Sequence, residues 1–152
     1  MDPVLTGRIL GPEGWVQGRV WFTHRIEALE EAPVEGPYIL PGFLDLHVHG
    51  GGGFEVMAGP EGVEGTLRFH LRHGTTGFLA TTLTAPLPEL EGALKGSAQA
   101  RAGPWREALL GVHLEGAFIS PERLGAQPPF RLPPEPGVAQ ALLAQAPVRV
   151  LT

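Results

Sequence analysis

The stretch Pro41–Gly53, PGFLDLHVHGGGG, places two histidines one residue apart at the end of an apolar run and follows them with four glycines. The run FLDLHV predicts a β-strand, because short segments of apolar and β-branched residues bounded by glycine and proline are typical of strands. Successive side chains of a strand point to opposite faces. We therefore expect an apolar face that packs under helices and an inward face that carries the histidines: Leu44, Leu46 and Val48 on the first, and Phe43, Asp45, His47 and His49 on the second.

His47 and His49 fall at the carboxyl end of this strand, where parallel barrels build their active sites. Gly50–Gly53 allow the backbone to turn sharply and to approach a ligand without side-chain obstruction. An isolated pair of this kind would be interpreted as two partly buried polar residues, but the inward pairing, the strand-end position and a third candidate ligand together favour metal ligation. A phosphate-binding loop is a weaker alternative for the glycines, because the stretch lacks both the GxGxxG spacing and a GK[ST] ending.

Three more segments of strand character follow, FLATTLT from Phe78, ALLGVHLE around Leu109 and VRVLT from Val148. The four strands begin 31 to 39 residues apart, which is the length of a βα unit. Repeated βα units predict an α/β fold with a parallel sheet, open or closed. Helical periodicity fills the intervals between the strands: Val63, Leu67 and Leu71 before a stop at Gly74, then Leu87, Leu90 and Leu94, then Val138, Ala141, Leu142 and Gln145.

Residues 1–40 have a different character and are predicted to form a small β domain. The segments VLTGRIL and VQGRVWFTHRI favour strands, and GPEG at Gly11–Gly14 between them is a turn signal suited to a hairpin. The polar stretch EEAPVEGP then separates this domain from residues 41–152, which hold the βα units.

The number of βα units limits the architecture. An eight-stranded (β/α)8 barrel takes about 250 residues, and the whole chain has 152. Residues 41–152 hold βα units 1–3 and a fourth strand, within which the chain ends at Thr152. We therefore expect the first half of a TIM (β/α)8 barrel from a truncated larger protein, with a complete small doubly wound domain as the alternative.

Composition restricts the partners. The net charge is −5 at pH 7 and the Lys and Arg residues are scattered, which argues against nucleic acid. There is no cysteine, so a transition-metal site must use imidazole and carboxylate ligands. No apolar run reaches the roughly 18 residues of a membrane span, and the N-terminus has no basic region followed by an apolar stretch. These features predict a cytoplasmic protein without a nucleic-acid or membrane partner.

A third candidate ligand lies in GVHLEGAF, Gly111–Phe118. Alternation along this strand places His113 and Glu115 on its inward face. A buried glutamate is costly unless it is paired or binds a metal, so Glu115 is predicted as a ligand together with His47 and His49. A salt bridge to an arginine is the alternative. His113 is either a group that orients Glu115 or a plain core histidine. The outward face of the same strand is expected to be apolar: Leu110, Val112 and Leu114.

A metal held by imidazole and carboxylate makes hydroxide available near neutral pH and polarises a carbonyl, so the predicted chemistry is hydrolysis of an amide or ester. Such ligands suit Zn, Fe, Co and Mn alike. The reaction also needs a group that moves protons, and Asp45 lies too early in its strand to serve, so we expect it to be structural. Three histidines are not expected in the site, because they lie in the β domain or on the first helix: His24, His70 and His73.

Two motifs carry a family resemblance. PGFLDLHVHGGGG resembles the amidohydrolase superfamily, whose metal-dependent barrels carry His-x-His at the end of the first strand. GVHLEGAFISPERLGA resembles the N-acetylglucosamine-6-phosphate deacetylase family within it, and HGTTGFLATTLTAP is similar to that family's second βα unit. The likeness runs from about Tyr38 to Thr152. It implies a metal-dependent hydrolase, with one or two divalent ions, that removes acetate from the sugar phosphate N-acetylglucosamine 6-phosphate.

By that likeness Glu115 is a metal ligand, and His47 and His49 match the superfamily's first metal pair. The family's two further histidine ligands, its catalytic aspartate and most of its phosphate-binding groups come from later strands. No catalytic residue is therefore expected in this chain, which alone should be inactive. The resemblance also implies a homodimer for the complete enzyme.

Two positions depart from the family pattern. Ala117 stands where proline is usual, which is a tolerated loop change. Gln127 stands where a substrate-contacting histidine is usual, so Gln127 is a candidate substrate contact or a residue that supports the ligands. The surrounding loop, Gly116 to Pro136, holds six prolines and is expected to form a stiff cover over the site, with a mobile surface loop as the alternative.

Two other functions stay open. A different amidohydrolase, such as a dihydroorotase, would act on a cyclic amide, and the HLEGAF stretch favours the deacetylase over it. A noncatalytic βα fragment would work as a binding or assembly module. A stable monodisperse fold without metal or activity would favour this function, but an open half-barrel exposes strand edges and apolar surface, so we expect such a fragment to associate or aggregate.

Overall fold

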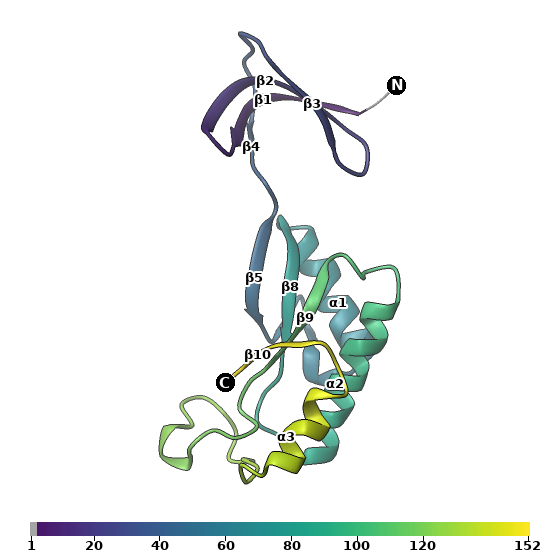
Figure 1. Ribbon diagram of the computed structural model, residues 1–152, viewed down its shortest axis with the longest axis vertical. Coiled ribbons are helices and arrows are strands. Elements are labelled where there is room, and N and C mark those ends of the chain that lie inside the picture. The colour runs from purple at the N-terminus through teal and green to yellow at the C-terminus, as the bar shows by residue number, and fades with distance from the viewer. Residues whose placement is uncertain (1–2) are drawn as a thin grey trace. The chain divides into compact units, whose positions relative to one another are not determined.

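The computed structural model describes residues 3–152. The chain divides into two compact units, Met1–Pro41 and Gly42–Thr152 (Figure 1).

The first unit is a four-stranded sheet in the order β3-β2-β1-β4. The predicted hairpin forms, because β1 and β2 pair antiparallel up to the facing residues Gly11 and Gly14. The run VQGRVWFTHRI is not one strand, since the chain turns after Phe22 and the N–H of Thr23 donates to the carbonyl of Arg25 at 2.9 Å. A further strand, missed from the sequence, then pairs with β2. The strands are β1 (Val4–Gly11), β2 (Gly14–Phe22), β3 (Ile26–Glu31) and β4 (Tyr38–Ile39).

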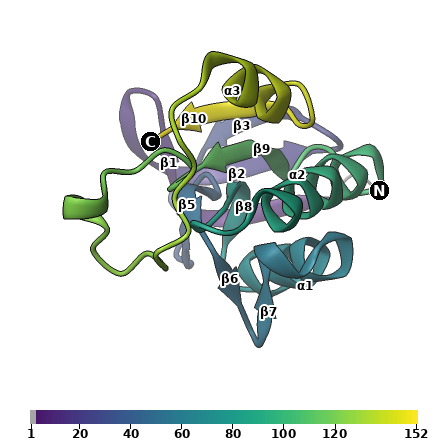
Figure 2. The same ribbon diagram turned by 90° about the horizontal axis from the view of Figure 1, so that it is seen from below.

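The second unit is a parallel sheet in the order β10-β9-β8-β5, with the helices on one face (Figures 1 and 2). The predicted α/β fold with a parallel sheet is confirmed. Its strands are β5 (Phe43–Val48), β8 (Thr75–Thr81), β9 (Leu109–Leu114) and β10 (Val148–Leu151), and its helices are α1 (Pro60–Leu71), α2 (Leu87–Ala102) and α3 (Pro136–Leu143). Short elements are β6 (Gly50–Gly51), β7 (Phe54–Glu55), η1 (Val56–Ala58) and η2 (Pro121–Arg123).

The helix ends follow the local chemistry of the chain. α1 begins at Pro60, whose fixed φ suits the first helical position and whose missing N–H is not needed there. Gly74 follows the helix with φ +89°, a left-handed conformation that glycine adopts without steric cost. The chain can therefore reverse there and enter β8.

Two apolar clusters hold the helices against the sheet. One joins α1 to β5, β8 and the start of β9, and the other joins α2 and α3 to β9. Burial of one such side chain contributes about 1.5–3 kcal/mol. The fully buried members include Val63, Leu67, Phe78 and Leu109 in the first cluster and Leu90, Leu94, Leu114 and Leu142 in the second.

The prediction that Leu44, Leu46 and Val48 form one apolar face of β5 packed under helices is wrong. Val48 is buried against α1, but Leu44 and Leu46 are 66% and 58% exposed. The β5–β8 pairing shifts register on both sides of Leu44 and Asp45, so strict alternation does not hold along the strand. Leu44 instead lies beside Leu110 over Gly77, which also removes Leu110 from its predicted face.

No helix among the described residues is both long and apolar enough to cross a membrane.

Candidate metal centre

The sheet brings the three predicted ligands together at the carboxyl ends of two strands. His47 and His49 lie at the end of β5, and Glu115 follows the last residue of β9. One ligand atom from each residue lies within 4.8 Å of the others. His49 Nε2 lies 3.2 Å and His47 Nε2 lies 3.9 Å from Glu115 Oε2.

These separations fit a shared metal ion. Ligand atoms that bind one zinc at about 2.0–2.2 Å in tetrahedral geometry stand roughly 3.3–3.6 Å apart. The two nitrogen–oxygen distances in the site, 3.2 and 3.9 Å, lie on either side of that range. An imidazole–carboxylate set suits borderline divalent cations. The three residues can therefore hold a metal with little rearrangement.

The carboxyl end of β8 orients His49. His49 Nδ1 lies 3.2 Å from the carbonyl oxygen of Thr81, which can only accept a hydrogen bond. Nδ1 therefore carries the proton, and the lone pair of Nε2 faces Glu115. Metal-binding histidines commonly have their second ring nitrogen fixed in this way. The hydroxyl of Thr81 also accepts from the N–H of Val48 at 2.9 Å, which ties β8 to β5.

The next residue, Thr82, holds Glu115. Its hydroxyl accepts from the N–H of Glu115 at 3.1 Å and donates to the carbonyl of Glu115 at 3.0 Å. Thr81 and Thr82 are fully buried, so these bonds form away from water. Adjacent threonines thus position the histidine strand on one side and the glutamate on the other.

Gln127 contacts the carboxylate itself. Its Nε2 donates to Glu115 Oε2 at 2.8 Å, and its Oε1 accepts from the N–H of Thr84 at 2.8 Å. The imidazoles of His47 and His49 lie 3.9 Å and 3.2 Å from the Glu115 carboxylate. No arginine pairs with Glu115 among residues 3–152, so the arginine alternative does not describe this part of the chain.

His113 lies beside the candidate ligands, but its Nε2 faces Thr152 and not the carboxylate of Glu115. Its ring is 5.1 Å from the ring of His47, and its Nε2 lies 2.7 Å from the hydroxyl of Thr152. Burial lowers the pKa of His113, and the neighbouring His47 lowers it further. A histidine with a lowered pKa is held in its neutral form, which avoids adding positive charge next to a cation site.

The four glycines form a tight hairpin rather than a loose loop. β6 and β7 pair antiparallel, and the turn residues Gly52 and Gly53 have φ of +63° and +86°. This conformation favours glycine at both positions. The carbonyl of Gly50 accepts from His70 Nε2, which lies 3.1 Å away on α1. His70 was not expected near the site.

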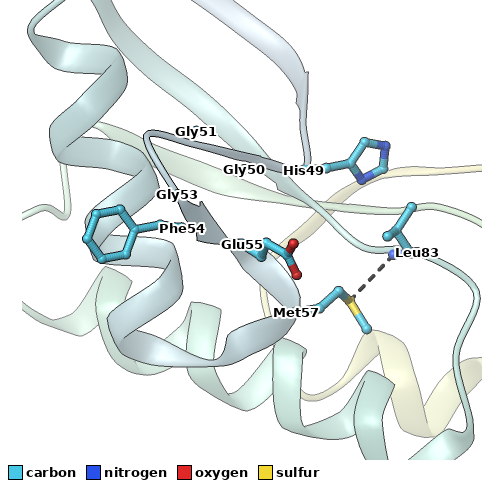
Figure 3. Close-up of a pocket in the computed structure, with 8 residues that line it drawn as sticks. All are labelled: His49, Gly50, Gly51, Gly53, Phe54, Glu55, Met57 and Leu83. Carbon is cyan, nitrogen blue, oxygen red and sulfur yellow. Dashed lines mark hydrogen bonds between the residues drawn. The ribbon is translucent and has the colours of Figure 1, made fainter.

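The hairpin walls a pocket of about 400 Å³ that reaches His49 (Figure 3). Figure 3 shows the side chains of Glu55 and Met57 on the same side of the hairpin as the His49 ring, with Phe54 directed away from them. Met57 sulfur accepts from the N–H of Leu83 at 3.5 Å. The pocket combines an apolar wall with a carboxylate, beside one candidate ligand.

Sequence reasoning missed several of these supporting residues. Thr81 ends a buried strand that lies between the two ligand strands, Thr82 and Thr84 follow it, and that position was the available signal. His70 falls three residues after the buried Leu67, on the helix face that packs inward. Asp45, expected to be structural, accepts from the N–H of His47 at 3.0 Å.

Comparison with known proteins gives consistent matches. The amidohydrolase family model matches residues 38–152. The chain is 39% identical over 133 residues to N-acetylgalactosamine-6-phosphate deacetylase of Escherichia coli O157:H7, and 38% identical over 130 residues to N-acetylglucosamine-6-phosphate deacetylase of Bos taurus. These alignments cover 80% and 83% of the chain but 35% and 31% of the relatives. The chain thus spans about a third of the length of the curated relatives it matches.

Solved structures agree with the fold. The N-acetylglucosamine-6-phosphate deacetylase of Thermotoga maritima superposes with a TM-score of 0.82 at 29% identity, covering 91% of this chain and 39% of that chain. A mutant deacetylase from Mycobacterium smegmatis in complex with N-acetyl-D-glucosamine-6-phosphate has a TM-score of 0.79 at 28% identity, covering 95% of this chain and 40% of that chain.

Proposed function

Because the chain belongs to the amidohydrolase family, we propose that it supplies part of the metal centre of a hydrolase that removes acetate from N-acetylglucosamine 6-phosphate. The observation that carries this proposal is the convergence of His47, His49 and Glu115 from two strands of one parallel sheet. The names of the similar proteins support the acetylated sugar phosphate as substrate class.

We propose a domain division to match. Residues 1–40 form a small β domain, and residues 41–152 form βα units 1–3 and strand 4 of an amidohydrolase barrel. The parallel order of β5, β8, β9 and β10, each beside the strand that precedes it in this set, supports successive βα units of such a barrel.

The three ligand residues would hold a divalent cation, Zn, Fe, Co or Mn, as one ion or the first of two. Such an ion polarises the amide carbonyl and lowers the pKa of water, which is the chemistry that amide hydrolysis needs. Thr81 and Thr82 keep His49 and Glu115 in place before the ion arrives. Preorganised ligands lose little freedom on binding, so affinity is retained.

His113 and Gln127 have supporting roles in this proposal. His113 stays neutral beside the cation site, because burial lowers its pKa. Gln127 hydrogen-bonds the carboxylate of Glu115, which favours a role in supporting that ligand over direct contact with the sugar.

Acetate release by the full-length protein tests the proposal. The acetylated substrates are N-acetylglucosamine 6-phosphate, N-acetylgalactosamine 6-phosphate and unphosphorylated N-acetylglucosamine, each with Zn, Fe, Co or Mn added. The cyclic amide dihydroorotate releases no acetate, so its ring opening is measured in a parallel assay with the same metals. We expect the first substrate to be hydrolysed fastest. Faster hydrolysis of the galactosamine compound would reassign the sugar, and hydrolysis of the cyclic amide alone would reassign the enzyme class.

A histidine pair supplies the matched control. The double variant His47→Ala with His49→Ala should lose bound metal and activity together, whereas His24→Ala with His73→Ala should keep both. Full activity in the first variant would overturn the proposed ligands. Monodisperse protein that binds no metal and hydrolyses none of the substrates would favour a noncatalytic module.

A further inference from the structure

The segment between β9 and α3 is a long loop that is tied down at its base. It leaves the carboxyl end of β9 after Glu115 and returns to α3 at Pro136 (light green in Figure 2). The N–H of Leu132 donates to the carbonyl of Ala117 at 2.8 Å, which closes the base. Inside this closure lies η2, whose first turn is capped by the hydroxyl of Ser120. The loop therefore has internal order.

One side chain of this loop reaches the candidate ligands. Gln127 donates from Nε2 to Glu115 Oε2, the same oxygen that faces His49 Nε2. The orientation of the amide follows from its other end, because the N–H of Thr84 can only donate and therefore faces Oε1. The hydroxyl of Thr84 also donates to the carbonyl of Pro128. Gln127 and Pro128 of the loop are thus hydrogen-bonded to Thr84, which lies just after β8, and Gln127 is also bonded to the carboxylate of Glu115.

We propose that Gln127 is a positioning residue that couples the closed position of this loop to the orientation of the Glu115 carboxylate. The proposal rests on the proposed function only in taking Glu115 as a metal ligand. A hydrogen bond to an ionised carboxylate is stronger than one between neutral groups. If the loop opens, the carboxylate loses the Gln127 donor, and if the carboxylate is removed, Gln127 loses its hydrogen bond to the ligand set.

Trypsin cleavage in the metal-free, full-length protein reports the loop position. Arg123 and Arg131 are exposed, flank Gln127, and are not followed by proline. Mass spectrometry can quantify cleavage at these two bonds. Gln127→Ala removes both the donor to Glu115 and the acceptor of the Thr84 N–H, so cleavage should accelerate by at least about tenfold, the factor expected when one hydrogen bond to a charged group is lost. Gln140→Ala, at an exposed glutamine on α3, is the matched control and should leave the rate unchanged.

Gln127→Glu separates the hydrogen bond from packing. It keeps the size of the side chain and the oxygen that accepts from Thr84, but it replaces the donor with a second negative charge facing Glu115. We expect cleavage at least as fast as in Gln127→Ala. A wild-type rate in Gln127→Glu would show that the side chain acts by filling space and would overturn the proposal.

A double-mutant cycle tests the coupling itself. Glu115→Ala should also accelerate cleavage at Arg123 and Arg131, and the double variant Glu115→Ala with Gln127→Ala should be no faster than Gln127→Ala alone, because the two single variants remove the same hydrogen bond. Additive effects, or no effect of Glu115→Ala on the loop, would overturn the proposal.

Zinc affinity supplies the reciprocal measurement. Competition with a chelating dye should show about a tenfold higher Kd for Zn²⁺ in Gln127→Ala, the loss typical when a partner of a metal ligand is removed. A Kd for Zn²⁺ that is unchanged in Gln127→Ala would overturn the proposed coupling. This conclusion would hold even if the wild-type protein releases acetate and the proposed function is therefore correct. A positive cleavage cycle in a protein that releases no acetate would instead retain the coupling and reject the proposed function.

Discussion

The two strands that carry the candidate ligands are held very differently. β5 is an edge strand with most of its residues exposed, whereas β9 lies between β8 and β10 and is almost entirely buried. The side chains follow the strands, because those of His47 and His49 are 51% and 35% exposed and that of Glu115 is 18% exposed. Glu115 is hydrogen-bonded through its N–H, its carbonyl and its carboxylate.

This difference separates a fixed half of the site from an adaptable half. Glu115 is positioned by groups that need not move when a cation binds, while His47 approaches the carboxylate at 3.9 Å from an exposed strand. Ordering a side chain on binding costs about 0.5–1.5 kcal/mol. We therefore expect the affinity for metal to depend most on Glu115, next on the oriented His49, and least on the residues that support β5 and its hairpin.

Removal of the fixed ligand should have the largest effect. In the full-length protein, Glu115→Ala should raise the Kd for Zn²⁺ by more than the roughly 100-fold upper value for outer partners of metal ligands. Glu122→Ala, at an exposed glutamate in the loop, is the matched control and should bind Zn²⁺ as the wild type does. A Glu115→Ala protein within tenfold of wild-type affinity would remove Glu115 from the ligand set.

The two histidines should differ from each other. His49 has its tautomer fixed by the Thr81 carbonyl and lies nearer the carboxylate, so His49→Ala should weaken Zn²⁺ binding roughly tenfold more than His47→Ala. Isothermal titration calorimetry on both variants measures the difference. Equal losses would mean that His47 becomes as well ordered as His49 when the metal binds, and the distinction between the two histidines would disappear.

The sequence predicted the elements better than it predicted their faces. Period, turn residues and spacing placed the parallel strands and three helices, because those signals are local. Strand alternation failed at Leu44 and Leu110, where the register shifts between strands. A register shift depends on the neighbouring strand, so one strand's own residues do not reveal it.

The candidate site was likewise predicted only in part: the ligands were found from the sequence, and the residues that hold them were not. His47, His49 and Glu115 were accessible because each stands at a strand end, and parallel strands end at one edge. The groups that hold them act across large sequence separations: Thr82 reaches Glu115 over 33 residues and His70 reaches Gly50 over 20. A threonine hydroxyl or a helix-end histidine looks the same in the sequence whether or not such a contact exists.

Two buried threonines test how Glu115, the fixed half of the site, is held in place. Thr82→Val removes the hydroxyl that pairs with both backbone groups of Glu115, so the free energy of unfolding should fall by about 1–3 kcal/mol. Thr66→Val is the matched control, because Thr66 is equally buried and its hydroxyl has no hydrogen-bond partner in the described structure. That change should be neutral or slightly stabilising. Urea denaturation measures both, and equal values would remove Thr82 as a support of Glu115.

The smallest effect is expected at the hairpin beyond the adaptable strand. His70 Nε2 donates to the carbonyl of Gly50, the residue after His49, so His70→Ala should cost about 1 kcal/mol of stability and weaken Zn²⁺ binding a few-fold. His73, just beyond α1, is the matched control, because no hydrogen bond joins its ring to the hairpin among the described contacts. If both variants bind Zn²⁺ alike, the hairpin keeps its position through packing of Phe69 against Gly51 and Gly52, where any side chain larger than glycine would collide with the ring.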